Sequence, residues 1–167
     1  MPSPRILKDL NEGIYFLTFT TKHWYYLFDR HGRWNVIARS LTYCRNHRHL
    51  KLYGFVFMLN HLHLIVGSPD VAGFVRDFKR HTSRELHKNI IATEPSIERL
   101  FLEHDARCAV WQPTNMPVRL ETEKVFLQKV QYIHENPVRK QYVLRPEDWY
   151  WSSANPVCEL TVDSLFG

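Results

Sequence analysis

The sequence predicts an α+β fold in which helices pack on a β-sheet. A run rich in β-branched and aromatic residues at 14–20 is typical of a strand. Two further apolar runs, at 53–58 and 61–66, are separated only by a short Leu-Asn break and predict a hairpin. Apolar residues at helical spacing over 33–48 and 71–89 predict two helices that cover the apolar sheet surface.

Length and composition indicate one folded domain. With 167 residues, of which 44% are hydrophobic and 14% aromatic, the chain is long enough to bury a core. We assign residues 1–153 to this domain and residues 154–167, which are mildly acidic, to a loosely held C-terminal tail. The net charge of +5 suits a polyanionic partner such as nucleic acid, although many unrelated proteins carry a similar charge.

The cysteines and the hydropathy pattern indicate a cytoplasmic protein. Cys44, Cys108 and Cys158 are odd in number and far apart, which supports neither a disulfide framework nor a zinc knuckle. The start of the sequence carries no apolar signal core, and no uninterrupted apolar run approaches the roughly 20 residues of a membrane span.

The second half of the chain predicts one more helix and several connections. Residues 92–105 are polar and predict a connection with a short helical turn, 106–111 predict a strand, and 112–117 a loop with two prolines. Phe126, Val130 and Ile133 form an apolar stripe on a helix over 121–136, which Pro137 is expected to end.

An aromatic cluster follows the first predicted strand. His23, Trp24, Tyr25 and Tyr26 are consecutive in the sequence. Such rings can stack on unpaired bases, but clusters of this kind are more often partly buried packing. Both interpretations remain open for this segment.

His61 and His63 are the strongest chemical signal in the chain. They lie two residues apart at the start of a predicted strand, so both rings point to one face while Leu62 and Leu64 point to the other. Two imidazoles side by side on a rigid strand can form half of a site for a divalent metal ion. The alternative is that one or both rings only pack against the turn.

Tyr132 and Asn136 form a second pair with chemical potential. They are four residues apart on the predicted third helix and therefore project from the same face. An amide oxygen could add a metal ligand, and a tyrosine hydroxyl beside a metal and a phosphate could attack phosphorus. Spacing alone is equally consistent with a tyrosine packed at the edge of the domain.

Basic residues on the predicted second helix are candidate phosphate contacts. Lys79, Arg80 and Arg84 lie on faces other than its apolar stripe. An ordinary solvated helix face would show the same pattern.

Four segments together resemble the small His-hydrophobic-His (HUH) single-strand transposases, and especially the REP-associated tyrosine transposases. The segments begin at Tyr15 (Tyr-Phe-Leu-Thr-Phe-Thr), Met58 (Met-Leu-Asn-His-Leu-His-Leu-Ile-Val), Phe78 (Phe-Lys-Arg) and Tyr132 (Tyr-Ile-His-Glu-Asn-Pro-Val-Arg). Segments around Trp111 and at 149–153 are also similar, so the resemblance spans about residues 14–153.

This resemblance implies a fold, an activity and roles for particular residues. The fold would be a ferredoxin-like antiparallel sheet with helices packed on one face. Tyr132 would cleave single-stranded, hairpin-forming DNA to give a 5′-phosphotyrosine and a free 3′-hydroxyl, and His61, His63 and Asn136 would hold Mg²⁺ or Mn²⁺. Trp111 and Arg139, which lie in matching segments, complete the predicted DNA-binding set. Relatives of this type act as monomers or as homodimers.

Two other functions compete with this DNA nuclease and strand transferase. One is a domesticated protein that binds hairpin nucleic acid without cutting it. The other is a histidine-based phosphohydrolase acting on nucleotides, although Ile65 stands where a third histidine would continue the alternation.

Overall fold

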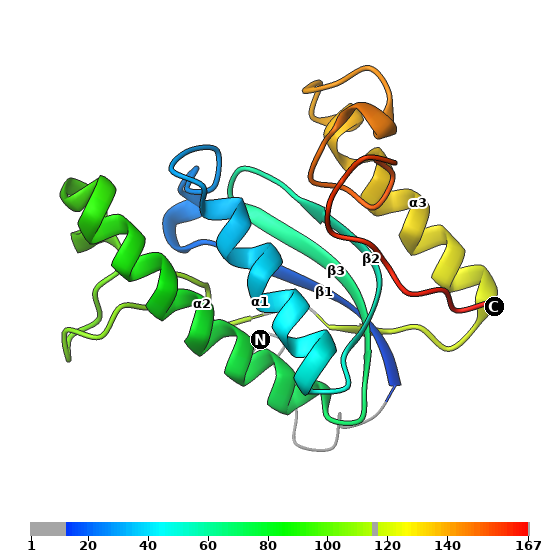
Figure 1. Ribbon diagram of the computed structural model, residues 1–167, viewed down its shortest axis with the longest axis horizontal. Helices are drawn as coiled ribbons and strands as arrows, with labels where there is room; N and C mark the ends of the chain where they lie inside the picture. The colour runs from blue at the N-terminus through cyan, green and yellow to red at the C-terminus, as the bar shows by residue number, and fades with distance from the viewer. Residues whose placement is uncertain (1–12, 115–116, 167) are drawn as a thin grey trace, which may run out of the picture.

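The computed structural model describes residues 13–114 and 117–166, and it confirms an α+β fold. In these residues a four-stranded antiparallel sheet has the order β2-β3-β1-β4. The strands are β1 (Gly13–Thr20), β2 (Lys51–Phe57), β3 (His61–Ser68) and β4 (Val118–Arg119). The helices are α1 (Arg33–His47), α2 (Val71–Thr93) and α3 (Glu123–Arg139). Helices α1 and α2 cover one face as predicted, whereas α3 lies across the other face (Figure 1).

The alternation of side chains along β3 divides the sheet into two different faces. Leu62 and Leu64 belong to the large core on the α1–α2 side, while Ile65 belongs to a smaller cluster beneath α3. His63 pairs in register with Thr18 of β1, so both of these residues also face α3. The predicted orientation of the two histidines away from the main core is therefore confirmed.

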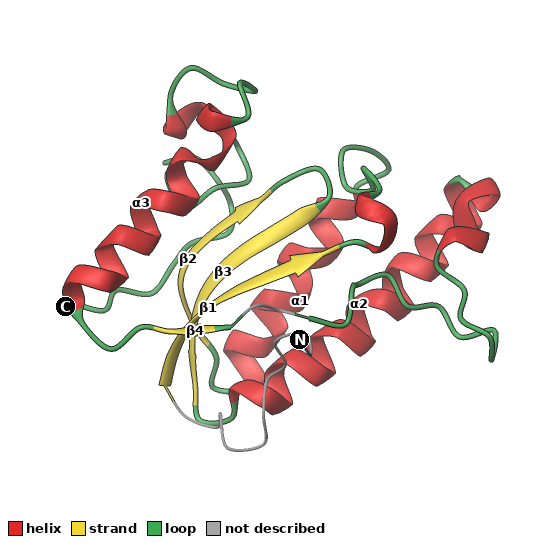
Figure 2. Ribbon diagram, turned by 180° about the vertical axis from the view of Figure 1, so that it is seen from behind, coloured by secondary structure: helices red, strands yellow, loops and turns green. Residues whose placement is uncertain are grey.

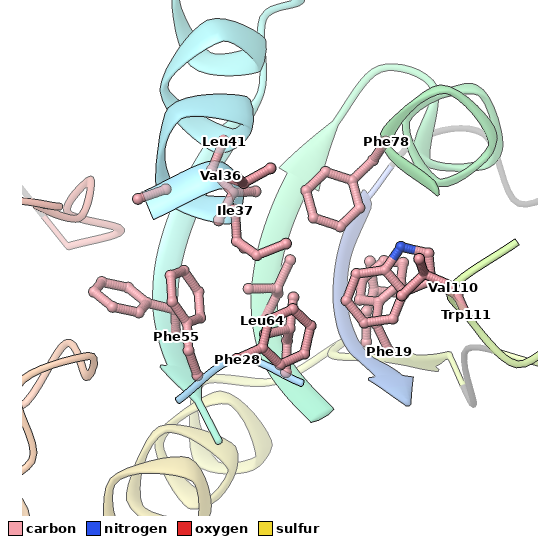
Figure 3. Close-up of a cluster of buried hydrophobic side chains, with 14 of the residues drawn as sticks. Phe19, Phe28, Val36, Ile37, Leu41, Phe55, Leu64, Phe78, Val110 and Trp111 are labelled. Carbon is pink, nitrogen blue, oxygen red and sulfur yellow. The ribbon is translucent and has the colours of Figure 1, made fainter. Parts of the chain in front are cut away.

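The main core fills the space between the sheet and helices α1 and α2 (Figure 3). Every large element of that side contributes at least one fully buried apolar side chain, and aromatic rings dominate the contacts. The residues labelled in Figure 3 are Phe19, Phe28, Val36, Ile37, Leu41, Phe55, Leu64, Phe78, Val110 and Trp111. This core holds β1 and β3 rigidly from one side, which leaves their other side free to carry polar groups.

Helix α3 approaches the sheet closely because β2 has a glycine beneath it. A Cβ atom on Gly54 would lie only 3.0 Å from Cδ1 of Ile133. Phe126 and Ile133 are buried against Val56 and Ile65. The helix begins at a cap in which the Thr122 hydroxyl accepts a hydrogen bond from the Val125 amide, at 3.2 Å.

The predicted end of this helix at Asn136 is wrong, because Pro137 lies inside its last turn. Proline fixes φ at a helical value and removes only one amide donor, which a final turn can tolerate better than a helix interior can. The amides of Lys140 and Tyr142 donate to the carbonyls of Asn136 and Pro137, and these bonds complete the turn. The helix therefore carries Arg139 on regular backbone.

Two further expectations differ from the structure. Residues 106–111 form no strand: Cys108 and Trp111 make only isolated bridges, and the fourth strand is β4 instead. The described part of the C-terminal tail, 154–166, is not loosely held, because Leu160 is buried in the main core and Asp163 hydrogen-bonds the backbone of Leu52. The predicted helical turn within 92–105 is confirmed as a 3₁₀ helix at Pro95–Leu100.

Other parts of the sequence analysis bear on residues outside this description or on membrane insertion. The N-terminal stretch 1–12 and residues 115–116 of the predicted loop lie outside the described residues. Within the described chain, no helix combines the length and apolarity required to cross a membrane.

Arg33 is fully buried at the start of α1 and ties the preceding loop to the end of α2 (Figure 2). Its guanidinium lies 2.9 Å from the Glu94 carboxylate and donates to the Leu27 carbonyl and to the Asn89 side chain. A buried cation needs such partners because its desolvation is costly. This network fixes the loop that follows β1.

We expect Arg33→Met to lower the free energy of unfolding by about 3 kcal/mol, because it removes one member of a buried ion pair. Arg30→Met is the matched control: Arg30 also pairs with Glu94 but is partly exposed, so its loss should cost under about 1 kcal/mol. Urea unfolding followed by circular dichroism measures both values. Equal losses in the two variants would contradict a special role for the buried residue.

Candidate active site between the sheet and the third helix

His61 and His63 form the floor of the candidate site on the α3 side of the sheet. Their ring centroids are 4.8 Å apart and the rings are nearly perpendicular, with an interplanar angle of 74°. His63 is buried, while His61 at the strand end is partly exposed. The two rings thus form a rigid pair that is open toward solvent at one end.

Neighbouring side chains orient both rings. Nδ1 of His61 lies 2.8 Å from the side-chain oxygen of Asn60, which can only accept, so Nδ1 carries the proton and Nε2 keeps its lone pair. Nδ1 of His63 lies 3.0 Å from the Thr18 hydroxyl, and Phe16 stacks on the same ring at 5.2 Å. Such outer hydrogen bonds are what fixes the tautomer of a metal-binding histidine.

Both imidazoles are held neutral at physiological pH. Burial, reinforced by the charge of Lys140, lowers the pKa of His61 to about 4. Burial also lowers the pKa of His63 to about 3, with further contributions from His61, Arg139 and Lys129. Because a metal ion binds the neutral ring, the site is ready for a cation without first losing a proton.

Tyr132 projects from α3 above this pair. Its ring centroid lies 5.6 Å from that of His63, and 41% of its surface is exposed. The Arg139 guanidinium lies 4.5 Å from the centre of the tyrosine ring and donates to the Tyr132 carbonyl, and the Lys129 ammonium lies 5.5 Å from the ring. The phenol is therefore accessible and is flanked by two cations that favour negative charge beside it.

Asn136 supplies an acceptor that the described protein leaves without a partner. Its side chain is buried, and its Oδ1 atom accepts no hydrogen bond from the described residues. A buried carbonyl oxygen without a partner is unfavourable, so a donor or a cation at this atom would stabilise the site. The described residues contain no group of three or more His, Cys, Asp or Glu that could hold a metal ion. The two histidines together with this amide oxygen fit the need for a third ligand.

The predicted DNA contacts on α2 and at Trp111 lie on the other side of the sheet. The Lys79 ammonium donates to the carbonyls of Gln112 and Pro113, and burial lowers its pKa to about 8. Trp111 is buried in the main core, and its indole donates to the Thr82 hydroxyl at 2.9 Å. These two side chains join the 110–113 segment to α2, and neither is presented to a ligand.

Of the predicted DNA contacts, only Arg139 is brought to the candidate site. Arg80 and Arg84 lie on α2 at the rim of a cavity of about 700 Å³ beside α1, which Arg39 and Arg48 also line. Arg80 lies 3.6 Å from Asp77. Contacts of Arg80 and Arg84 with DNA stay predictions.

Several residues of the site were not found from the sequence. Thr18 and Phe16 reach the histidines only through the β1–β3 register, although their place in the period-two pattern of β1 was a usable signal. Asn60 stands next to His61 in the sequence, yet only the turn geometry gives it a role. Lys129 was overlooked although it is three residues before Tyr132 and so shares its helix face.

Comparison with solved structures identifies the fold. The chain is similar to a REP-associated tyrosine transposase whose structure was solved bound to a REP hairpin, with a TM-score of 0.68 and 18% identity over 92% of this chain and 82% of that one. A candidate transposase from Deinococcus radiodurans matches less well, with a TM-score of 0.44 and 16% identity over 81% and 97% of the two chains. No protein-family model and no curated protein sequence matches the chain. The chain therefore has the fold of a REP-associated tyrosine transposase.

The histidine pair predicts a distinct dependence of stability on pH. Unfolding returns both pKa values from about 4 and about 3 to near 6.5, so below pH 6.5 the unfolded chain binds protons that the folded chain does not. We expect the free energy of unfolding to be unaffected by this pair above pH 7 and to fall as the pH drops from 6.5 toward 4. His63→Gln should reduce that slope in urea titrations across this range.

The exposed His104 provides the control. His104→Gln should leave the slope of wild type unchanged, and NMR titration should show no protonation of the His61 and His63 rings between pH 6 and 8. A slope that is identical in wild type and His63→Gln would contradict burial of a neutral imidazole.

Proposed function

We propose that this protein is a metal-dependent endonuclease and strand transferase that acts on hairpin-forming single-stranded DNA through Tyr132. The observation that carries the proposal is the position of this exposed phenol, 5.6 Å from the His63 ring and between Arg139 and Lys129. A tyrosine needs a cationic environment to act as a nucleophile at neutral pH, because its ordinary pKa is about 10.

His61, His63 and Asn136 would hold Mg²⁺ or Mn²⁺. Support comes from the two neutral imidazoles, whose Nδ1 atoms are engaged by Asn60 and Thr18, and from the unpartnered buried oxygen of Asn136. When bound, such an ion orients the scissile phosphate and neutralises charge on its oxygens. Carbonyl oxygen suits Mg²⁺ and Mn²⁺, and imidazole is also compatible with Mn²⁺.

The chemical step that we propose conserves atoms and charge. The Tyr132 oxygen attacks phosphorus while its proton passes to solvent, and a bond forms between this oxygen and phosphorus. The bond from phosphorus to the 3′ oxygen breaks, and that oxygen takes up a proton from solvent. The products are a 5′-phosphotyrosine and a free 3′-hydroxyl, and attack by another 3′-hydroxyl would reverse the step and join two strands.

Arg139 would position the nucleophile and stabilise the phosphate. Its guanidinium already contacts both the ring and the backbone carbonyl of Tyr132, and its charge lies close enough to lower the pKa of His63. Lys129 contacts the opposite neighbour, the Phe16 ring, at 4.7 Å. Together these cations would attract the DNA backbone to the site, as the net charge of +5 would do at longer range.

A hairpin-binding protein without cleavage activity is the second candidate function. Among the described residues, no histidine or carboxylate is hydrogen-bonded to the Tyr132 hydroxyl, so the described chain alone provides no general base for it. The solved relative was captured with a REP hairpin, and binding of such a hairpin is common to both candidates.

A covalent-adduct assay separates the two candidates. Wild type incubated with labelled single-stranded hairpin DNA and Mn²⁺ should give a protein–DNA band on a denaturing gel, and Tyr132→Phe should give none because the attacking oxygen is absent. Tyr43→Phe, which alters an exposed tyrosine on the other side of the sheet, should retain the band. Hairpin binding without an adduct in wild type, with either metal, would favour the binding protein.

Metal binding can be measured without DNA. Calorimetric titration with Mn²⁺ should show one site, and His61→Ala, His63→Ala and Asn136→Ala should each weaken it by at least about 10-fold, because each removes one of three protein ligands. His104→Ala should bind as wild type does. If Asn136→Ala retained full affinity, the third ligand would have to be sought elsewhere.

A further inference from the structure

The short segment after β1 presents aromatic rings to solvent at the end of the sheet where His61 lies. The 3₁₀ turn Lys22–Trp24 follows Thr21, and 67% of the Trp24 surface is exposed. Tyr26, two residues later, is 53% exposed. These rings are not the partly buried packing that is common for such clusters, so their conservation of an exposed position in the fold needs another explanation.

The backbone beneath Trp24 is held in a conformation that costs free energy. His23 and Trp24 have φ values of 60° and 51°, in the left-handed region that residues other than glycine rarely adopt. Hydrogen bonds impose this turn: the amide and hydroxyl of Thr21 both donate to the Asn60 carbonyl, and the Asn60 side chain donates to the Trp24 carbonyl at 3.1 Å. The exposed indole therefore stands on a rigid, strained turn.

Asn60 connects this turn directly to the candidate metal site. Its side-chain nitrogen donates to Trp24, and its side-chain oxygen accepts from the His61 ring. One amide thus fixes the backbone of the exposed tryptophan and the orientation of a predicted metal ligand at the same time.

A second exposed aromatic reaches the same end of the sheet from α3. Tyr142 follows Lys140, whose charge acts on His61, and its phenol is hydrogen-bonded to that of Tyr26. The Tyr142 ring stacks on Trp149 at 5.5 Å, and the Trp149 indole donates to the Phe57 carbonyl. Tyr26 and Tyr142 are thereby joined across two segments that are far apart in the sequence.

We propose that Trp24, Tyr26 and Tyr142 form a stacking surface for unpaired bases of the strand that enters the Tyr132 site. The inference rests on the proposed function for the location of the strand and adds a binding site for its bases. Aromatic rings stack on any base but only when it is unpaired, so this surface would select single-stranded DNA beside the scissile phosphate over duplex DNA. Lys140, between Tyr142 and the site, would contact the backbone of the same strand.

The test compares the binding of two hairpins that differ only in a single-stranded flank. Fluorescence anisotropy is measured in EDTA with Tyr132→Phe as the parent protein, so that neither metal nor cleavage is required. Adding Trp24→Ala should weaken binding of the flanked hairpin by about 5-fold to 100-fold, which is the usual contribution of one stacked base. Binding of the blunt hairpin should not change.

Matched variants and abasic substitutions define the site. Tyr43→Ala, an exposed aromatic on α1, should bind both hairpins as the parent does, and Trp24→Phe should recover most of the loss. Replacing one flank base with an abasic site should weaken binding of the parent but add little to Trp24→Ala, because both changes remove the same contact. Thermal unfolding verifies that each variant is folded.

Equal weakening of blunt and flanked hairpins in Trp24→Ala, or no weakening of either, would overturn the inference, as would a parent protein that binds no flanked hairpin. The outcome is separable from that of the proposed function. A flank-dependent loss in Trp24→Ala combined with no covalent adduct in wild type supports the stacking surface and rejects the nuclease. An adduct in wild type with no flank dependence gives the opposite result.

Discussion

The two-residue period of β3 is the constraint on which the rest of this structure depends. It sends Leu62, Leu64 and Val66 into the main core and leaves His61 and His63 on the opposite face. The core anchors the strand, so the imidazoles need no movement of their own to be held in place. Helix α3 then closes over the histidines only in part, which buries His63 while keeping the phenol of Tyr132 accessible.

The electrostatics of the site follow from this arrangement. Burial lowers the pKa of both imidazoles, and the cations of α3 and the residue after it lower them further. The same positive charges lie around Tyr132. A site that disfavours protons on its histidines is thus also one that attracts an anion, and these are the two requirements for a metal ion and a phosphate to share it.

Sequence patterns predicted the parts of this fold that depend on local periodicity. Strand β1, the β2–β3 hairpin and all three helices were located, together with the face on which His61 and His63 lie. What depends on contacts between distant segments could not be predicted in this way: the pairing of Thr18 with His63, the bond from Asn60 to Trp24, and the burial of Trp111. Pro137 was misjudged because its cost depends on its position within a turn, and the packing of α3 on Gly54 supports a helix that continues beyond it.

The integration of the C-terminal segment has a consequence for how this sheet can meet other chains. Strand β2 is at the edge of the sheet, where free amides and carbonyls would ordinarily invite another strand. Here the backbone of Trp151 and Ser153 bonds Phe57 and Phe55, and Asp163 bonds Leu52, so the chain's own end occupies that edge. Continuing the sheet across two copies at β2 would require this segment to be displaced first.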